Sequence, residues 1–404
     1  MLPQIRRSYN ESFSESAYAA FLEGMRREHG HPVLFRVAET PVFLPAALKG
    51  RLVEACEGIL EVVMRKDFRQ LSRGAIPAGL AVPNEDAHTT FLAIDFAVCR
   101  DEAGELVPQL IELQGFPSLY GYQELLNRSF RRHFAVPGGF TPFFSGLDRE
   151  GYVELLRKAV LGECGSENVV LLEIEPEKQK TNVDFYCTQA LLGVRPVCIS
   201  EVVKEGTRLF YRDGDRKTPI HRIYNRVIFD ELLKRRDLPR AFNLTDAVEV
   251  EWAGHPNWFF RISKFTMPLL TRLGAASRYV PESRFLSEMS AYPADLENYV
   301  LKPLYSFAGA GVKFDVTPAD LDAVGEGARP DYILQKKVNY EPVVEAADGG
   351  LVKAEIRMLY LWPERDATPT LAVNLARLSR GVMIGVDFNK NKTWVGGTIA
   401  LFEK

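Results

Sequence analysis

Residues 91–114 read FLAIDFAVCRDEAGELVPQLIELQ, and this stretch decides how the chain is organised. Phe91–Cys99 is short and apolar and is interrupted by a single acidic residue, Asp95. A turn-like segment follows at 100–104, and Glu105–Leu113 is a second run of the same kind. Two apolar runs joined in this way predict a pair of antiparallel strands. Because an unpaired charge inside an apolar strand is costly, Asp95 needs a partner.

Glu112 and Gln114 stand two residues apart on the second predicted strand, so their side chains project from the same face. If Asp95 lies beside them on the neighbouring strand, two carboxylates and an amide oxygen form one cluster of oxygen ligands. Such a cluster suits Mg²⁺ shared with phosphate oxygens. The alternative is an acidic pair on a solvated strand face, because every antiparallel sheet contains such pairs.

Two lysines lie in segments that could face a nucleotide. YVLKPLYSFAGAGV, residues 299–312, predicts a strand that carries Lys302 into a loop of small residues with two glycines. Glycines let backbone N–H groups approach phosphate oxygens, although a structural turn explains the loop equally well. Lys264 lies in the aromatic stretch HPNWFFRISKFTMPLL. It either snorkels from a helix or reaches a phosphate.

Three arginines interrupt apolar runs that predict strands: Arg226, Arg357 and Arg377. Arginine in such a place requires a fixed anion, which is either a structural carboxylate or a carboxylate or phosphate of a substrate. The six histidines are dispersed, and no GxSxG or HExxH pattern is present. The sequence therefore gives no support to a serine hydrolase or a zinc hydrolase.

The composition is that of a globular protein. The chain has 404 residues, of which 46% are hydrophobic and 25% charged, and its formal net charge is −3. This balance gives no electrostatic reason to expect nucleic acid or an anionic membrane as a partner. No apolar run approaches the roughly 20 residues that span a bilayer. The first residues lack the apolar core of a secretory signal, and the five cysteines are scattered, so we expect a cytoplasmic protein with reduced thiols.

The pieces together resemble the ATP-grasp superfamily, and most of all its circularly permuted branch, that of glutathionylspermidine synthetase. AIDF followed by LIELQGFPS is similar to the metal-binding strand pair of that family. NWFFRISKFTMPLL and YVLKPLYSFAGAGV resemble its two segments with nucleotide-binding lysines, and YILQKKV resembles the strand that meets the adenine. The metal-binding strands precede the lysines here, whereas they follow them in ordinary ATP-grasp chains.

The resemblance implies an α+β protein with a circularly permuted ATP-grasp fold and a small α/β domain of the pre-ATP-grasp kind. The alternation of strands and helices after residue 149 is also typical of a small α/β layer domain. We expect four parts, in chain order: an N-terminal helical region at 1–85, the metal-binding β segment of the core at 86–148, the small α/β domain at 149–250, and the nucleotide-binding lobe with the closing sheet at 251–404.

By this analogy the chain binds ATP and Mg²⁺. The residues expected to hold Mg²⁺ are Asp95, Glu112 and Gln114. Those expected to contact the phosphates are Lys264 and Lys302. The loop expected to cover the phosphates, Ser306–Gly311, includes Ser306, Gly309 and Gly311, and the residues expected to line the adenine pocket are Gln335, Lys336 and Val338.

The implied activity is a ligase that joins a small-molecule or peptide carboxylate to an amine through an acyl phosphate. An arginine must then hold the attacking carboxylate. The family has one two residues before the aspartate, where this chain has Ala93. We therefore expect Arg226, Arg357 or Arg377 to take this role, with Arg377 favoured slightly. Two other functions stay open, a nucleotide-binding regulatory protein without turnover and a phosphotransferase that acts on a hydroxyl.

Overall fold

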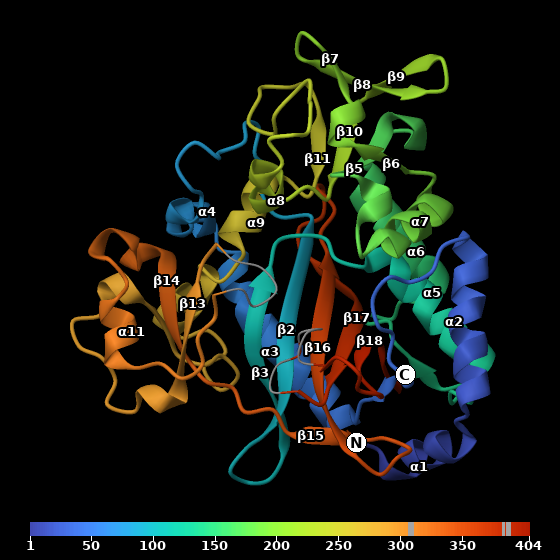
Figure 1. Ribbon diagram of the computed structural model, residues 1–404, viewed down its shortest axis with the longest axis vertical. Helices are drawn as coiled ribbons and strands as arrows, with labels where there is room; N and C mark the ends of the chain where they lie inside the picture. The colour runs from blue at the N-terminus through green and yellow to red at the C-terminus, as the bar shows by residue number, and fades with distance from the viewer. Residues whose placement is uncertain (306–310, 382–383, 385–388) are drawn as a thin grey trace.

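A central antiparallel sheet organises the chain. The computed structural model describes residues 1–305, 311–381, 384 and 389–404. The strand order in this sheet is β18-β17-β16-β2-β3, with β15 paired to β16 (Figure 1). Its strands are β2 (Phe91–Arg100), β3 (Leu106–Gln114), β15 (Pro342–Glu345), β16 (Leu351–Leu361), β17 (Thr370–Ser379) and β18 (Gly396–Thr398). The predicted strand pair of residues 91–114 is thus confirmed, and it adjoins strands from the far end of the chain.

The register of this sheet gathers charged residues on one face. Asp95 lies directly opposite Glu112 on one side and Arg357 on the other. Glu355 lies opposite Arg377. Directly opposed residues of antiparallel strands point to the same face, and so do residues two apart. The register shifts immediately after Asp95, where β3 contains a bulge.

The opposite face of the sheet belongs to the main core. Ile94, Phe96 and Val98 alternate with the residues of the charged face and are fully buried. Helix α3 (Ala46–Val63) lies against β3, and its apolar stripe is buried as its three- and four-residue spacing predicts. One face of the sheet is therefore sealed by apolar packing, which leaves the charged face as the one available for chemistry.

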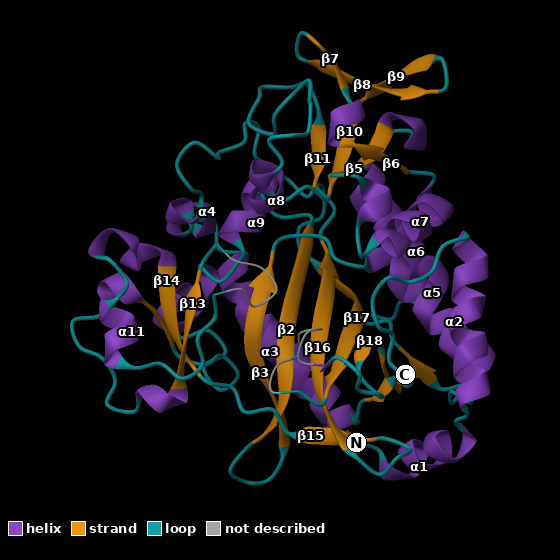
Figure 2. Cartoon of the chain, in the orientation of Figure 1, coloured by secondary structure: helices purple, strands orange, loops and turns teal. Residues whose placement is uncertain are grey.

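A parallel sheet with flanking helices forms the small α/β part. Its strand order is β11-β10-β5-β6. Figure 2 shows helices gathered beside and below it, on one side of the central sheet. The elements are α5 (Tyr120–His133), α6 (Arg149–Leu161), β5 (Val169–Glu173), α7 (Asn182–Leu192), β6 (Arg195–Cys198), β10 (Arg222–Asn225), α8 (Phe229–Lys234) and β11 (Glu251–Ala253). The alternation predicted from the sequence is confirmed, and a three-stranded antiparallel sheet projects from it: β7 (Val203–Glu205), β8 (Arg208–Asp213) and β9 (Arg216–Ile220).

A third sheet, of order β12-β14-β13, lies beside the β3 edge of the central sheet (Figure 1). It belongs to a small lobe with its own core around Leu286, Leu301 and Leu334. The elements in and next to this lobe are α9 (Pro256–Arg261), α10 (Thr266–Arg272), β12 (Ser283–Phe285), β13 (Tyr299–Pro303), α11 (Pro318–Asp322) and β14 (Tyr332–Lys336). The lobe carries Lys302, and the segment between α9 and α10 carries Lys264.

The two ends of the chain meet in a short sheet of order β1-β19-β4. The last strands of the chain belong to two sheets, because the chain leaves the central sheet after Thr398 and pairs with β1 from Ala400. The Thr398 hydroxyl donates to Thr40 O at 2.7 Å and so fixes this change of sheet. The remaining elements are α1 (Pro3–Ser12), α2 (Glu15–His29), β1 (Val42–Phe43), α4 (Phe68–Leu71), β4 (Phe140–Thr141) and β19 (Ala400–Glu403).

Within the described residues, no helix has the length and apolar character needed to cross a membrane.

Candidate functional site

Asp95 lies at the centre of a network of ion pairs on the charged face of the central sheet. Arg357 Nε donates to Asp95 Oδ1 at 2.6 Å, and Arg357 Nη2 donates to Oδ2 at 2.6 Å. Arg377 Nη2 donates to the same Oδ2 at 2.8 Å. Asp95 is fully buried. A bidentate pair with a third charge-assisted hydrogen bond is a strong and geometrically fixed arrangement.

A second carboxylate holds the outer arginine of this network. Arg377 Nη2 also donates to Glu355 Oε1, and Tyr340 OH donates to Glu355 Oε2 at 2.8 Å. Burial raises the pKa of Glu355, although the charge of Arg377 opposes this shift. Tyr340 belongs to the linker between β14 and β15, so the network also fastens the segment that connects the small lobe to the central sheet.

Glu112 and Gln114 lie on the same face beside this network. Gln114 Nε2 donates to Glu112 Oε1 at 2.8 Å, and Arg357 Nη2 lies 3.9 Å from that oxygen. The side chain of Glu112 is 28% exposed. The carboxylate of Glu112 and the amide oxygen of Gln114 therefore offer oxygen donors on the charged face.

Lys302 reaches this face from the small lobe. Its Nζ donates to Ile111 O, in the bulge of β3, at 3.3 Å. Burial of the ammonium group lowers the pKa of Lys302 to about 8. The carboxylate of Glu112 opposes this shift, and the charge of Lys264 adds to it. A partly buried lysine beside another cation is a group that gains from the arrival of an anion.

Lys264 approaches Glu112 from the segment between α9 and α10. Burial lowers the pKa of Lys264, and Glu112 is the strongest opposing charge. The chain is brought there by Gly115, directly after β3, which donates to Ile262 O at 2.8 Å. A Cβ at Gly115 would lie 2.4 Å from Trp258 O, so only glycine permits this close approach of β3 to α9.

The residues expected around the adenine lie at the edge of the small lobe. Gln335 lies opposite Val300, two residues from Lys302 and on the same strand face. It is buried, and among the described residues neither of its amide atoms has a hydrogen-bond partner. Lys336 and Val338 line a pocket of about 520 Å³ with Cys99 and Val107 of the central sheet.

A separate group of buried polar atoms lies at the carboxyl edge of the parallel sheet. Arg226, which follows β10, is 7% exposed. Among the described residues its Nε and Nη1 have no hydrogen-bond partner. Its guanidinium lies over the rings of Phe116 and Phe185, 5.0 Å and 5.5 Å from their centroids. Phe116 follows Gln114 by two residues, so this edge adjoins the end of β3.

Two buried carboxyl groups face this arginine. Burial raises the pKa of Glu173 to about 8, and Arg226 is the main charge that opposes the shift. Burial also raises the pKa of Asp184, whose Oδ1 accepts from the Tyr122 amide at 2.9 Å. Asp184 Oδ2 has no partner among the described residues, and neither has the nearby oxygen Oδ1 of Asn182. The carboxyl edge of the parallel sheet thus combines one cation with several polar atoms whose hydrogen bonds a ligand could complete.

The donor set fits Mg²⁺ only in part. Glu112 and Gln114 supply hard oxygens on the charged face, as this ion requires. Both oxygens of Asp95 are engaged by guanidinium groups, so Asp95 offers none in this arrangement. Within the described ranges, no three His, Cys, Asp or Glu side chains lie together as a metal-binding group. That Asp95, Glu112 and Gln114 jointly bind Mg²⁺ therefore stays a prediction.

Residues 306–310 of the predicted phosphate-covering loop, which include Ser306 and Gly309, lie outside the described residues. Gly311 is described, and its backbone is left-handed with φ 71°. A Cβ at Gly311 would lie 3.1 Å from Pro303 Cγ, so a larger residue would be strained and crowded there.

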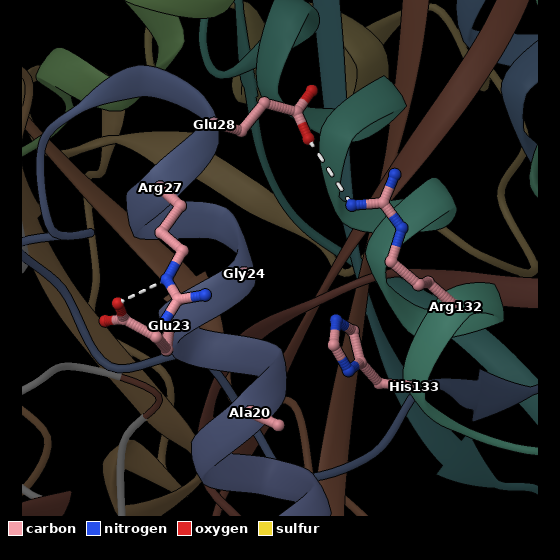
Figure 3. Close-up of a pocket in the computed structure, with 7 residues that line it drawn as sticks. All are labelled: Ala20, Glu23, Gly24, Arg27, Glu28, Arg132 and His133. Atoms are coloured by element: carbon pink, nitrogen blue, oxygen red, sulfur yellow. Dashed lines mark hydrogen bonds and ion pairs between the residues drawn. The ribbon is translucent and has the colours of Figure 1, made fainter.

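A further pocket, of about 540 Å³, lies between α2 and α5, away from both charged regions (Figure 3). Its arginines are paired with its glutamates: Arg27 lies 2.8 Å from Glu23, and Arg132 lies 3.9 Å from Glu28. His133 points between the two helices, and burial lowers its pKa. This surface gives no chemistry comparable with that of the central sheet.

The sequence did not single out several residues of these two regions: Glu355, Tyr340, Ser118, Glu173, Asn182 and Asp184. One of them carried a usable signal, because Glu355 stands two residues before Arg357 in an apolar strand and so shares its face. Asp184 and Glu173 gain their role only when α7 and β5 are brought beside Arg226, which no local pattern predicts.

The comparisons with known proteins concern the fold. No family model and no curated protein matches the chain. Thirty-one chains of solved structures do match. One is the apo form of a glutathione synthetase-like effector (GSS30) from Globodera pallida, with a TM-score of 0.60 and 12% sequence identity over 96% of each chain. The chain therefore shares the fold of a glutathione synthetase-like protein over nearly its whole length.

Proposed function

We infer that this protein is an ATP-dependent ligase that joins a carboxylate to an amine. The observation that carries this inference is the meeting of two lysines from separate segments, Lys264 and Lys302, beside Glu112 on the charged face of the central sheet. The shared fold with a glutathione synthetase-like effector supports a ligase of the ATP-grasp type.

The phosphate side of the site is built from four cations. Lys264 and Lys302 lie beside Glu112, while Arg357 and Arg377 lie across β2 from it, on β16 and β17. Cations fixed in a partly buried site stabilise the charge of a transferring phosphoryl group without reorganising. The base of the nucleotide would lie toward Gln335, Lys336 and Val338. Mg²⁺ held by Glu112 and Gln114 would add charge neutralisation at the phosphates when bound.

The acid would lie at the carboxyl edge of the parallel sheet. Arg226 is the cation there, and its Nε and Nη1 are turned to no partner among the described residues. An attacking carboxylate needs such a group to hold it in line with the γ-phosphate. Phe116 connects this arginine to the end of β3, which carries Glu112 and Gln114. Of the three arginines predicted for the acid, Arg226 is therefore our choice, since Arg357 and Arg377 are already paired with carboxylates.

The reaction has two steps. An oxygen of the acid attacks the γ-phosphorus of ATP, forms the acyl phosphate and releases ADP. The amine then attacks the acyl carbon, inorganic phosphate leaves with the electron pair of the C–O bond, and the amine loses a proton. No covalent intermediate on the protein is required.

The test traps the intermediate. Hydroxylamine replaces the amine and converts any acyl phosphate to a hydroxamate, which is measured by its colour with Fe³⁺ alongside ADP release. The assay is run over a panel of amino acids and γ-linked or α-linked dipeptides. Hydroxamate formation that requires both ATP and one acid supports the ligase, and Lys302→Met should abolish it. ADP release with a phosphorylated hydroxyl compound and no hydroxamate would instead indicate a phosphotransferase.

A second function is favoured by one specific observation. Ala93 and Leu359 are the residues directly next to the network on β2 and β16, and both are apolar. The place where the family has an arginine for the acid is thus packed into a core. A nucleotide-binding regulatory protein without turnover would have this feature. Nucleotide binding without hydroxamate or ADP release for any acid would support it.

A further inference from the structure

Asp95 is the residue whose surroundings depart most from the role that the sequence predicts for it. Its carboxylate accepts three hydrogen bonds from two guanidinium groups, at 2.6, 2.6 and 2.8 Å. It is fully buried, while the neighbouring side chain of Glu112 is 28% exposed. A residue that presents its charge to an incoming cation is expected to resemble Glu112 rather than Asp95.

The two arginines are fixed from their other sides as well. Arg357 Nη1 donates to Ser118 Oγ at 3.1 Å, in the turn after β3. Arg377 is held by Glu355, which Tyr340 holds in turn. Asp95 is the only group bonded to both arginines among the described residues. It therefore sets their mutual orientation.

Part of the arginine pair remains available to a ligand. The side chain of Arg377 is 34% exposed, and its Nε, although itself buried, has no hydrogen-bond partner among the described residues. The negative charges of the two carboxylates in the network balance the positive charges of its two guanidinium groups. The net charge of this face therefore comes from Glu112, Lys264 and Lys302. This net charge is positive when both lysines are protonated, so it favours the binding of an anion.

We propose that Asp95 is a positioning residue that holds Arg357 and Arg377 as a preformed clamp for phosphoryl oxygens, and that it is not a ligand of Mg²⁺. A direct Mg²⁺ ligand must bring its oxygen to about 2.1 Å from the ion. Asp95 would first have to release Arg357, a buried guanidinium that keeps only its hydrogen bond to Ser118 Oγ among the described residues. The clamp instead binds a phosphate chain without any divalent metal. The nucleotide as ligand rests on the proposed function, but the test below does not require it.

The test separates anion binding from metal binding. Metal-free tripolyphosphate, in excess chelator, is titrated by calorimetry. Mn²⁺, as a spectroscopic substitute for Mg²⁺, is titrated separately by electron paramagnetic resonance. Three variants are compared with the unaltered chain: Arg377→Gln, Asp95→Asn and Glu112→Gln. Arg377→Gln leaves the buried Asp95–Arg357 pair in place, and Glu355 keeps its hydrogen bond from Tyr340 OH, so this variant should disturb the fold less than Asp95→Asn does.

The clamp predicts that Arg377→Gln weakens tripolyphosphate binding at least about tenfold and leaves Mn²⁺ affinity within about twofold. If Asp95 were a metal ligand, removing Arg377 would take away one of the two hydrogen bonds to Asp95 Oδ2 and raise Mn²⁺ affinity. Asp95→Asn should likewise weaken tripolyphosphate binding and spare Mn²⁺, whereas Glu112→Gln should do the reverse. Loss of Mn²⁺ binding in a folded Asp95→Asn variant, with tripolyphosphate binding intact, would overturn the proposal.

The outcomes also distinguish this proposal from the proposed function. If the chain binds tripolyphosphate through Arg377 but binds ATP neither with nor without Mg²⁺, the phosphate clamp is supported and the ligase function is contradicted. If the chain binds ATP only with Mg²⁺ and does not bind metal-free tripolyphosphate, the ligase function remains supported and the phosphate clamp is contradicted.

Discussion

The charged face of the central sheet and the carboxyl edge of the parallel sheet both bury arginine, but in opposite states. On the central sheet, Arg357 meets Asp95 with two hydrogen bonds of 2.6 Å. At the parallel edge, Arg226 is equally buried, and two of its nitrogen atoms have no partner among the described residues. A buried cation with its bonds made is rigid, whereas one with bonds unmade is costly unless a ligand completes them. The charged face of the central sheet is thus preorganised before any ligand binds. The carboxyl edge of the parallel sheet has hydrogen bonds that only a ligand would complete.

The largest expected effect concerns stability. Arg357→Met leaves Asp95 buried with one remaining hydrogen bond, and breaking a buried ion pair from one side costs about 3–5 kcal/mol. Arg226→Met removes a guanidinium whose Nε and Nη1 hydrogen bonds are not made, so it should cost less than half as much. Urea unfolding monitored by far-ultraviolet circular dichroism measures both variants. Equal losses in the free energy of unfolding would contradict the view that Arg357 is bonded within the structure and Arg226 is not.

The second effect concerns the acid substrate. Arg226→Met should weaken binding of the acid by at least about tenfold, because one charge-assisted contact is worth about that much. Binding of an ATP analogue should change by less than about twofold, since Arg226 lies at the other region. Once the hydroxamate assay has identified the acid, isothermal titration of each ligand gives both numbers. Arg226→Lys serves as the matched control, which keeps the charge and loses the planar geometry. Unchanged acid binding in Arg226→Met would place the acid elsewhere.

The third effect is a pH dependence at the parallel edge. The pKa of Glu173 is raised to about 8, above its ordinary value of 4.5, so the folded state binds a proton that the unfolded state has released between these values. The contribution of Glu173 is fully present below pH 4.5 and is lost as pH rises through 8. Between pH 5 and 8, the free energy of unfolding should fall by about 1 kcal/mol or more relative to Glu173→Gln. Parallel stability curves for the two chains would contradict this.

The smallest effect is a pH dependence at the charged face. The pKa of Lys302 is lowered to about 8, so the ammonium loses its proton as pH rises through about 8 in the absence of a ligand. Anion binding should favour the protonated form, and affinity for an ATP analogue should fall about fourfold between pH 7 and 8.5. Titrations in buffers of different ionisation enthalpy should also show proton uptake. Lys302→Met should bind weakly at both pH values, and a fall that persists in that variant would assign the effect to another group.

Part of the site could be predicted from sequence because it is local. Asp95, Glu112 and Gln114 were placed on one face from strand alternation and a single turn, and the register confirms that Asp95 and Glu112 are opposed. Arg357 and Arg377 were singled out because a charge in an apolar strand needs an anion. That this anion is Asp95 itself could not be predicted, since β16 follows β2 only after some 250 residues and its register is set by the whole sheet.

The fold, like the site, could be predicted where its elements are local and not where they depend on long-range pairing. The strands β2 and β3, and strands around Arg357 and Arg377, were predicted from their apolar runs, and a mixed α and β protein is confirmed. The pairing of β1 with β19 joins residues near 42 to residues near 400, and no local signal predicts it. The proposed chemistry depends on these long-range pairings, because Lys302 meets Ile111 only when the small lobe lies beside β3.

The central claim is that Lys302 helps to bind nucleotide phosphates at the charged face. The most direct measurement is calorimetric titration of a non-hydrolysable ATP analogue, with Mg²⁺, into the unaltered chain, Lys302→Met and Lys66→Met. Lys66 is exposed and belongs to neither region, so its variant controls for loss of one positive charge. We expect the unaltered chain and Lys66→Met to bind alike and Lys302→Met to bind at least about tenfold more weakly. Equal binding by Lys302→Met, or no binding by the unaltered chain, would contradict this account.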